Sequence, residues 1–168
     1  MHKNILLILS VLFLFNFCST VNDKELFDKA QKDQTEQKYA EAVAGYDKLL
    51  AEAPKSEFAP QALFECAKIY HAEKIPDLPK EESLNKAVQY YKKLYQDHPD
   101  FKDAPSAMMM SGFILANELN KAEEAKTIYE EFLKKYPESP LAGSVKLELE
   151  SIGLSPDELL NRLARGTK

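Results

Sequence analysis

The sequence predicts an all-α fold, a solenoid of three helix pairs followed by C-terminal capping helices. Two observations support this prediction: a composition that favours helix, and a spacing pattern that recurs three times. Of the 168 residues, 45% are hydrophobic and 29% are charged, with no Trp and only 5 Gly. Ala, Leu, Glu and Lys dominate, which favours helix, and few segments show the alternation expected of strands.

The recurring pattern marks the second helix of each pair. An alanine is followed at +4 by a tyrosine, at +7 by a leucine or phenylalanine, and at +12 by a proline that ends the helix. The three sets are Ala42, Tyr46, Leu49 and Pro54; Ala87, Tyr91, Leu94 and Pro99; and Ala125, Tyr129, Phe132 and Pro137. We therefore expect three units, at about residues 23–56, 57–101 and 103–137, that bury their apolar faces by stacking.

The first helix of each unit carries a large apolar residue four positions before a small one. These pairs are Leu26 and Ala30, Leu63 and Ala67, and Met108 and Gly112. Together with the alanine–tyrosine–proline spacing, they make residues 23–137 resemble the tetratricopeptide repeat family. The resemblance implies a right-handed α-solenoid whose first helices line a concave groove for protein partners. Unit one has Gln37 where the family often has a turn glycine, and unit two carries an insertion, IPDLPKEE.

Groove-facing residues follow from the resemblance. They would be Phe27, Gln31, Phe64, Lys68, His71, Met109, Phe113 and Asn117. Apolar side chains interspersed with amides would suit a peptide with apolar anchors. The alternative is that these side chains only pack between adjacent first helices. The same two alternatives apply to three consecutive methionines, which could either pack adaptably in the core or form a binding surface: Met108, Met109 and Met110.

The N-terminal sequence indicates a targeting signal. Residues 1–17 combine a basic start with an apolar run too short to span a bilayer, which predicts a signal peptide. Cys18 follows directly, and its position resembles the lipidated cysteine of bacterial lipoproteins. Residues 18–22 would then be the lipidation site and a short linker. There are two alternatives. The leader could be cleaved near Ser19 or Thr20, or Cys18 could merely end the apolar run.

A lipidated repeat protein implies a scaffold anchored to the outer membrane and facing the periplasm, with an unanchored periplasmic or secreted adaptor as the alternative. Two groups are similar: the repeat lipoprotein of the β-barrel assembly machine and the repeat domain of the Tol-Pal coordinator. We expect protein or peptide partners. We expect no nucleic acid, because the net charge is −5 and no Lys or Arg stripe occurs.

The chain offers no evident catalytic or metal-binding set, and we expect no enzyme activity, cofactor or small-molecule substrate. Cys66 and His71 lie five positions apart, which places them on different faces of a helix. Cys66 is therefore expected to be a buried structural thiol. The three histidines form no metal pair at helical spacing.

Residues 138–165 are expected to cap the solenoid. Ser139 and Pro140 predict a helix start. An apolar stripe should then face the core, formed by Leu141, Val145, Leu147, Leu149 and Ile152. Gly153 predicts the helix end, and residues 155–158 predict a capping box that opens a last helix.

Overall fold

The computed structural model describes residues 22–154 and 157–158, and these form helices without strands. In chain order the helices are α1 (Asp23–Thr35), α2 (Tyr39–Glu52), α3 (Ala59–His71), α4 (Lys80–Asp97), α5 (Ala104–Phe113), the π-helix η1 (Ile114–Glu118), α6 (Ala122–Lys135) and α7 (Ala142–Ser151). Within the described part of the chain, no helix has both the length and the apolar character needed to cross a membrane. The leader and Cys18 lie outside the described residues.

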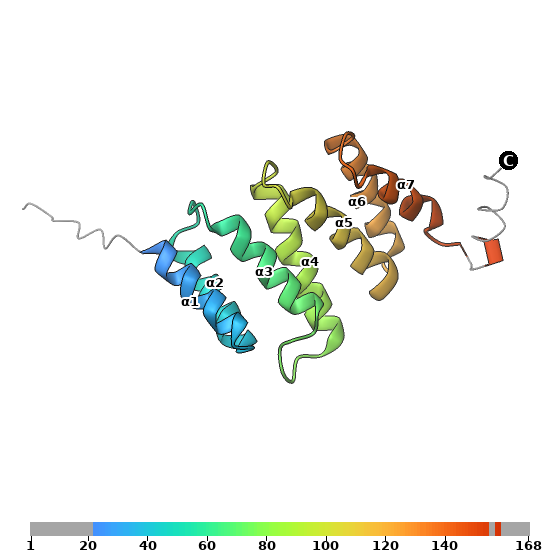
Figure 1. The fold of residues 1–168 in the computed structure, drawn as a ribbon. Helices are drawn as coiled ribbons and strands as arrows, with labels where there is room; N and C mark the ends of the chain where they lie inside the picture. Colours follow the sequence, from blue (N-terminus) through green and yellow to red (C-terminus); the bar gives the residue numbers. More distant parts are fainter. Residues whose placement is uncertain (1–21, 155–156, 159–168) are drawn as a thin grey trace, which may run out of the picture.

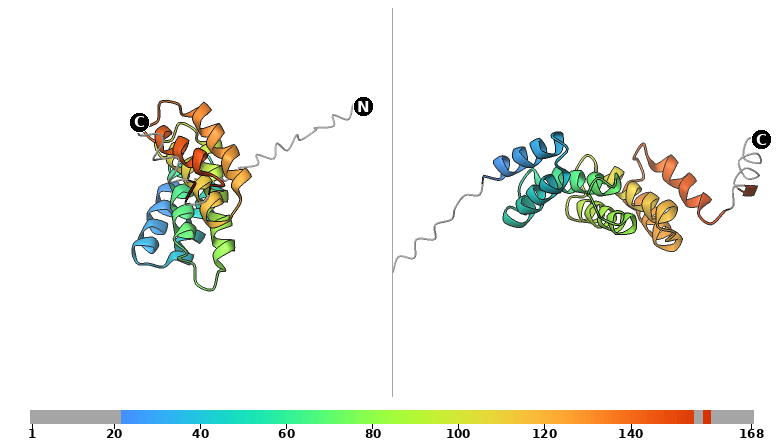
Figure 2. Two further views of the ribbon diagram at one scale, coloured as in Figure 1. Left: turned by 90° about the vertical axis from the view of Figure 1, so that its right-hand side faces the viewer. Right: turned by 90° about the horizontal axis from the view of Figure 1, so that it is seen from below.

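The helices form a row of antiparallel pairs. α1 pairs with α2, α3 with α4, and α5 with α6, and each helix packs mainly on its neighbours in the sequence. Figure 1 shows the pairs side by side along one axis, and the right view of Figure 2 shows first helices on one side and second helices on the other. This arrangement confirms the predicted all-α solenoid of helix pairs.

The recurring residues lie where the pattern predicts, at the contacts between helices. The three second-helix alanines are fully buried, and so are the apolar residues seven positions later. The tyrosines at +4 (Tyr46, Tyr91 and Tyr129) are also buried. Because the same three positions are buried in every pair, the core is one continuous layer through the solenoid.

Two irregular segments distinguish the second and third pairs. Residues 72–79, which contain Pro76 and Pro79 of the unit-two insertion, form a loop between α3 and α4. In the third pair, α5 continues as a π-helix, in which the Leu119 amide donates to the Ile114 carbonyl at 2.9 Å. A π-turn accommodates one extra residue inside a helix.

The start of the capping helix is shifted from its predicted position. α7 begins at Ala142, two residues after Pro140, the predicted first helical residue. The predicted capping hydrogen bond is present in the turn before the helix, where the Ser139 hydroxyl oxygen accepts from the Leu141 amide at 3.2 Å. The apolar stripe also needs a correction: Val145 is fully buried, whereas Leu147 is 60% exposed. Two positions along a helix turn a side chain by about 200°, so these residues cannot share a face. Residues 155–156 and 159–165 of the predicted last helix lie outside the described residues.

Candidate functional site

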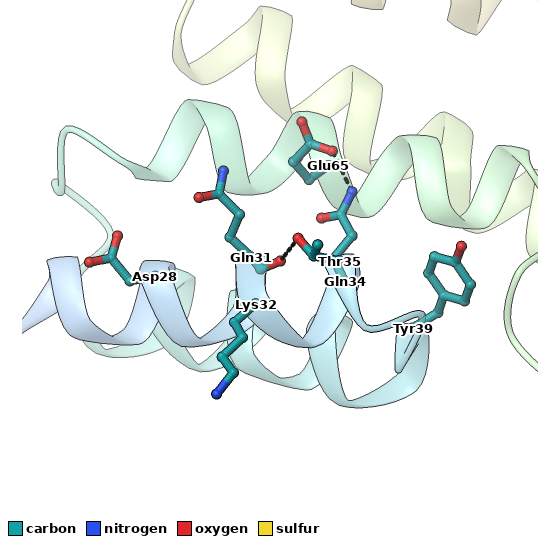
Figure 3. Close-up of a pocket in the computed structure, with 7 residues that line it drawn as sticks. All are labelled: Asp28, Gln31, Lys32, Gln34, Thr35, Tyr39 and Glu65. Carbon is teal, nitrogen blue, oxygen red and sulfur yellow. Dashed lines mark hydrogen bonds between the residues drawn. The ribbon is translucent and has the colours of Figure 1, made fainter.

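A polar hollow of about 570 Å³ lies between α1 and α3, the first helices of two consecutive pairs. Figure 3 shows its lining residues, Asp28, Gln31, Lys32, Gln34, Thr35, Tyr39 and Glu65. All except Glu65 come from α1 and the start of α2. We call this hollow the α1–α3 pocket. It is open to solvent and spans two units, so a ligand bound there would contact both.

Glu65 is the fixed centre of the α1–α3 pocket. Its carboxylate accepts hydrogen bonds from the Gln34 amide at 2.8 Å, from the Gln61 amide at 2.8 Å and from the Lys68 ammonium at 2.9 Å. The carbonyl oxygen of Gln34 in turn accepts from the buried Tyr46 hydroxyl at 2.7 Å. This network joins the core of the first pair to the surface of the second.

The charge on Glu65 is stabilised by the same network. Burial alone would raise the pKa of this carboxyl group, because it disfavours the charged form. Hydrogen bonds from Gln34 and Lys68 and the nearby Lys68 charge oppose that effect, and the pKa is lowered overall. Glu65 is therefore an anion at neutral pH, and its side chain is only 12% exposed.

Phe27 must be removed from the set of groove residues predicted from the sequence. It is 7% exposed, and its ring stacks on Phe58 at 5.1 Å between centroids and packs against Tyr46 at 5.7 Å. Phe58 immediately precedes α3 and covers Phe27 from the next unit. The Phe27 side chain therefore belongs to the core.

The other predicted apolar anchors are half-buried. Phe64 packs edge-on against Tyr91 at 5.9 Å between ring centroids, and the Lys68 ammonium lies 5.6 Å from the Phe64 ring centroid. Met109 is also partly buried against the core, as Met110 is, and Met108 is 1% exposed. The inner surfaces of these side chains pack on the core, and their outer surfaces remain accessible.

The polar members of the predicted set are more accessible. Gln31, Lys68 and Asn117 are exposed, and the structure brings Gln31 into the same pocket as Glu65. The Asn117 amide donates to the Phe113 carbonyl of its own helix at 3.2 Å. Phe113 itself is half-buried.

His71 forms a contact between two units that the sequence did not indicate. Its Nε2 lies 2.8 Å from Oε1 of Glu118, the last residue of η1, and Lys80 lies 3.8 Å from the other oxygen of Glu118. The π-helix changes the direction of every side chain after Ile114, and Glu118 is at its end. Sequence reasoning missed Glu118 because a π-helix leaves no clear signature in a single sequence.

Asp28, Gln34, Tyr39 and Glu65 were also missed. Glu65 lies next to the predicted Phe64 and one turn before Lys68, and that spacing could have identified it. Gln34 lies three residues after Gln31 and could have been found in the same way. Nothing in the sequence could have shown that Gln34 links Glu65 to a buried tyrosine.

Cys66 is fully buried, as predicted for a structural thiol. Burial raises the pKa of this thiol, and the nearby Asp47 and Glu65 charges act in the same direction. A neutral, inaccessible thiol is a poor nucleophile. Among the described residues, no group of three or more His, Cys, Asp or Glu side chains is arranged to hold a metal ion.

Comparison with known proteins gives one family match. No curated protein matches the chain. Residues 106–139, which include most of α5, all of η1 and α6, and the turn that follows, match the family described as tetratricopeptide repeat. This match covers the third helix pair, and it supports the interpretation of the chain as a tetratricopeptide-repeat protein.

Proposed function

We propose that this protein is a non-enzymatic scaffold of the bacterial cell envelope that binds protein partners along its first helices. The observation that carries the proposal is the α1–α3 pocket, an accessible polar hollow built from two consecutive first helices. Beside it lie the half-buried Phe64 and the exposed Lys68. A fixed polar hollow next to an apolar side chain suits recognition of a protein segment.

The envelope part of the proposal rests on the leader. A signal peptide over residues 1–17 and lipidation of Cys18 would attach the scaffold to the outer membrane, facing the periplasm. The resemblance to envelope lipoproteins that carry helical repeats supports a role in envelope or outer-membrane protein assembly. Mass measurement of the mature protein tests this part. A diacylglycerol-modified Cys18 is expected, and an unmodified mature chain that begins after Cys18 would instead support an unanchored adaptor.

Partner capture tests the scaffold part. In the double variant Gln31→Arg/Asn117→Arg, two exposed first-helix positions carry bulky cations. The matched control, Gln89→Arg/Thr127→Arg, introduces two arginines at exposed positions of α4 and α6. We expect proteins recovered from envelope extracts to be lost with the first variant and retained with the control. Equal recovery with both variants would contradict binding on the first helices.

A further inference from the structure

We infer that the α1–α3 pocket binds a cationic side chain, lysine or arginine, of a partner's peptide segment. The inference rests on the proposed scaffold function and specifies the chemistry of the partner. It follows from which groups line the pocket, how firmly they are held, and which of them remain available for a ligand.

The side chains that face the α1–α3 pocket carry net negative charge. Asp28 on α1 and Glu65 on α3 line it from two different helices. Lys32 is the one lysine among the lining residues, and Figure 3 shows its side chain pointing away from Glu65. A cation placed in this hollow would approach carboxylates from two sides, whereas an acidic side chain would meet like charges.

Glu65 is held in place before any ligand arrives. Amide donors from two helices, Gln34 on α1 and Gln61 on α3, fix its two oxygens at 2.8 Å each. Because the carboxylate is already ordered, binding costs little side-chain entropy at this residue. Hydrogen bonds to a carboxylate are also stronger than those between neutral groups.

Gln31 and Asp28 supply the groups that are free to change partner. Among the described residues, no hydrogen bond involves the side-chain amide of Gln31. The hydroxyl of Thr35 donates to the backbone carbonyl of Gln31 at 2.8 Å, which leaves the amide unengaged. Figure 3 shows this amide directed toward α3, where its oxygen can accept from a guanidinium or ammonium group. The pair between Asp28 and Lys24 is solvent-exposed, so its loss to a competing cation costs little.

Lys68 of the protein itself would compete with a ligand cation for the Glu65 carboxylate. Its ammonium contacts Glu65 but is 49% exposed, so it lies at the edge of the pocket. A lysine this exposed can rotate into solvent when a ligand cation takes its place. Removal of its charge should therefore strengthen binding of a cationic peptide, whereas removal of the Glu65 charge should weaken it. A merely structural role for Glu65 would not produce this opposite pair of effects.

The test uses short random peptides displayed as a library and selected on the full-length protein. We expect the selected peptides to be enriched in Lys and Arg relative to the input library. Their affinity should fall about tenfold for Asp28→Asn and for Glu65→Gln, and rise for Lys68→Met. Glu130→Gln removes an exposed carboxylate from α6 and should leave the affinity unchanged.

Three results would count against the inference. Enrichment of acidic or uncharged peptides would overturn the cationic preference while leaving the scaffold function intact. Basic peptides that bind Asp28→Asn and Glu65→Gln as well as the original protein would show that the cation is held elsewhere. The exposed Asp28 can be replaced without loss of core contacts, so unfolding cannot explain both variants. Selection of no peptide above the bare support would contradict the scaffold function as well.

Discussion

Gly112 of α5 lies directly against the ring of Tyr129 on α6. A Cβ atom placed on Gly112 would be 2.4 Å from Cε1 of Tyr129, closer than any normal contact. Tyr129 is fully buried, so its ring cannot move aside into solvent. The absence of a side chain at Gly112 therefore sets how closely the two helices of the third pair can approach.

Gly112→Ala should lower the free energy of unfolding by about 1–3 kcal/mol, because the added methyl group overpacks the α5–α6 contact. Urea denaturation followed by circular dichroism measures this change. Gly143→Ala in α7 is the matched control, since its Cβ would meet no atom within 4 Å. There the better helix propensity of alanine should leave stability unchanged or raise it by up to about 1 kcal/mol. Similar losses in both variants would refute the close contact.

Gln37→Gly should stabilise the first pair. Gln37 follows α1 with φ 62°, a left-handed conformation that is unfavourable for residues other than glycine. Relief of that strain exceeds the entropy that glycine adds to the unfolded chain, and we expect a gain of about 0.5–1 kcal/mol. Ala44→Gly, at an exposed interior position of α2, should instead cost about 1 kcal/mol. A loss at both positions would show that Gln37 is not strained.

Alkaline pH should unfold the protein through its buried tyrosines. Burial raises the pKa of Tyr91 and of Tyr95 to about 12, with a smaller effect from Glu65 on Tyr91 and from Glu131 on Tyr95. The folded state therefore keeps these protons at a pH where the unfolded state releases them. Their contribution to stability is complete below about pH 10 and is lost as the pH rises towards about 12.

The urea midpoint should consequently fall steadily across that range, and tyrosine ionisation, followed by ultraviolet absorbance, should accompany unfolding. Ionisation of Tyr91 or Tyr95 near pH 10 in a still-folded protein would contradict the burial of these side chains.

Leu147→Glu should change the free energy of unfolding by no more than about 0.5 kcal/mol, because the side chain is exposed. Val145→Ala, two residues earlier on the same helix, removes a fully buried side chain and should be clearly destabilising. Thermal unfolding of both variants checks the corrected orientation of α7. A larger loss for Leu147→Glu than for Val145→Ala would favour the stripe predicted from the sequence.

The sequence was most informative where a residue's size determines a helix contact. The spacing of Ala125, Tyr129 and Phe132 from Pro137 predicted which face of α6 is buried, because helical periodicity relates spacing directly to direction. How deeply a side chain is buried is a different property from the direction in which it points. Phe27 was assigned to the groove from its place in the repeat, and only the position of Phe58 in the next unit shows that it is covered.

The polar part of the candidate site could be predicted least. Glu65 and Gln34 become a site only through their contact across two units, 31 positions apart in the sequence. Glu118, the last residue of a π-helix that shifts its direction, contacts His71. Such contacts depend on how consecutive units stack, which local spacing does not encode.

Photo-crosslinking in cells tests the central claim most directly, that partners bind along the first helices. A photoreactive amino acid is placed at Gln31 in the α1–α3 pocket or, in a matched variant, at the exposed Thr127 on α6. We predict that irradiation yields a discrete crosslinked protein from position 31 and none from position 127. A crosslinked partner from position 127 alone would contradict the account and would place binding on the second helices.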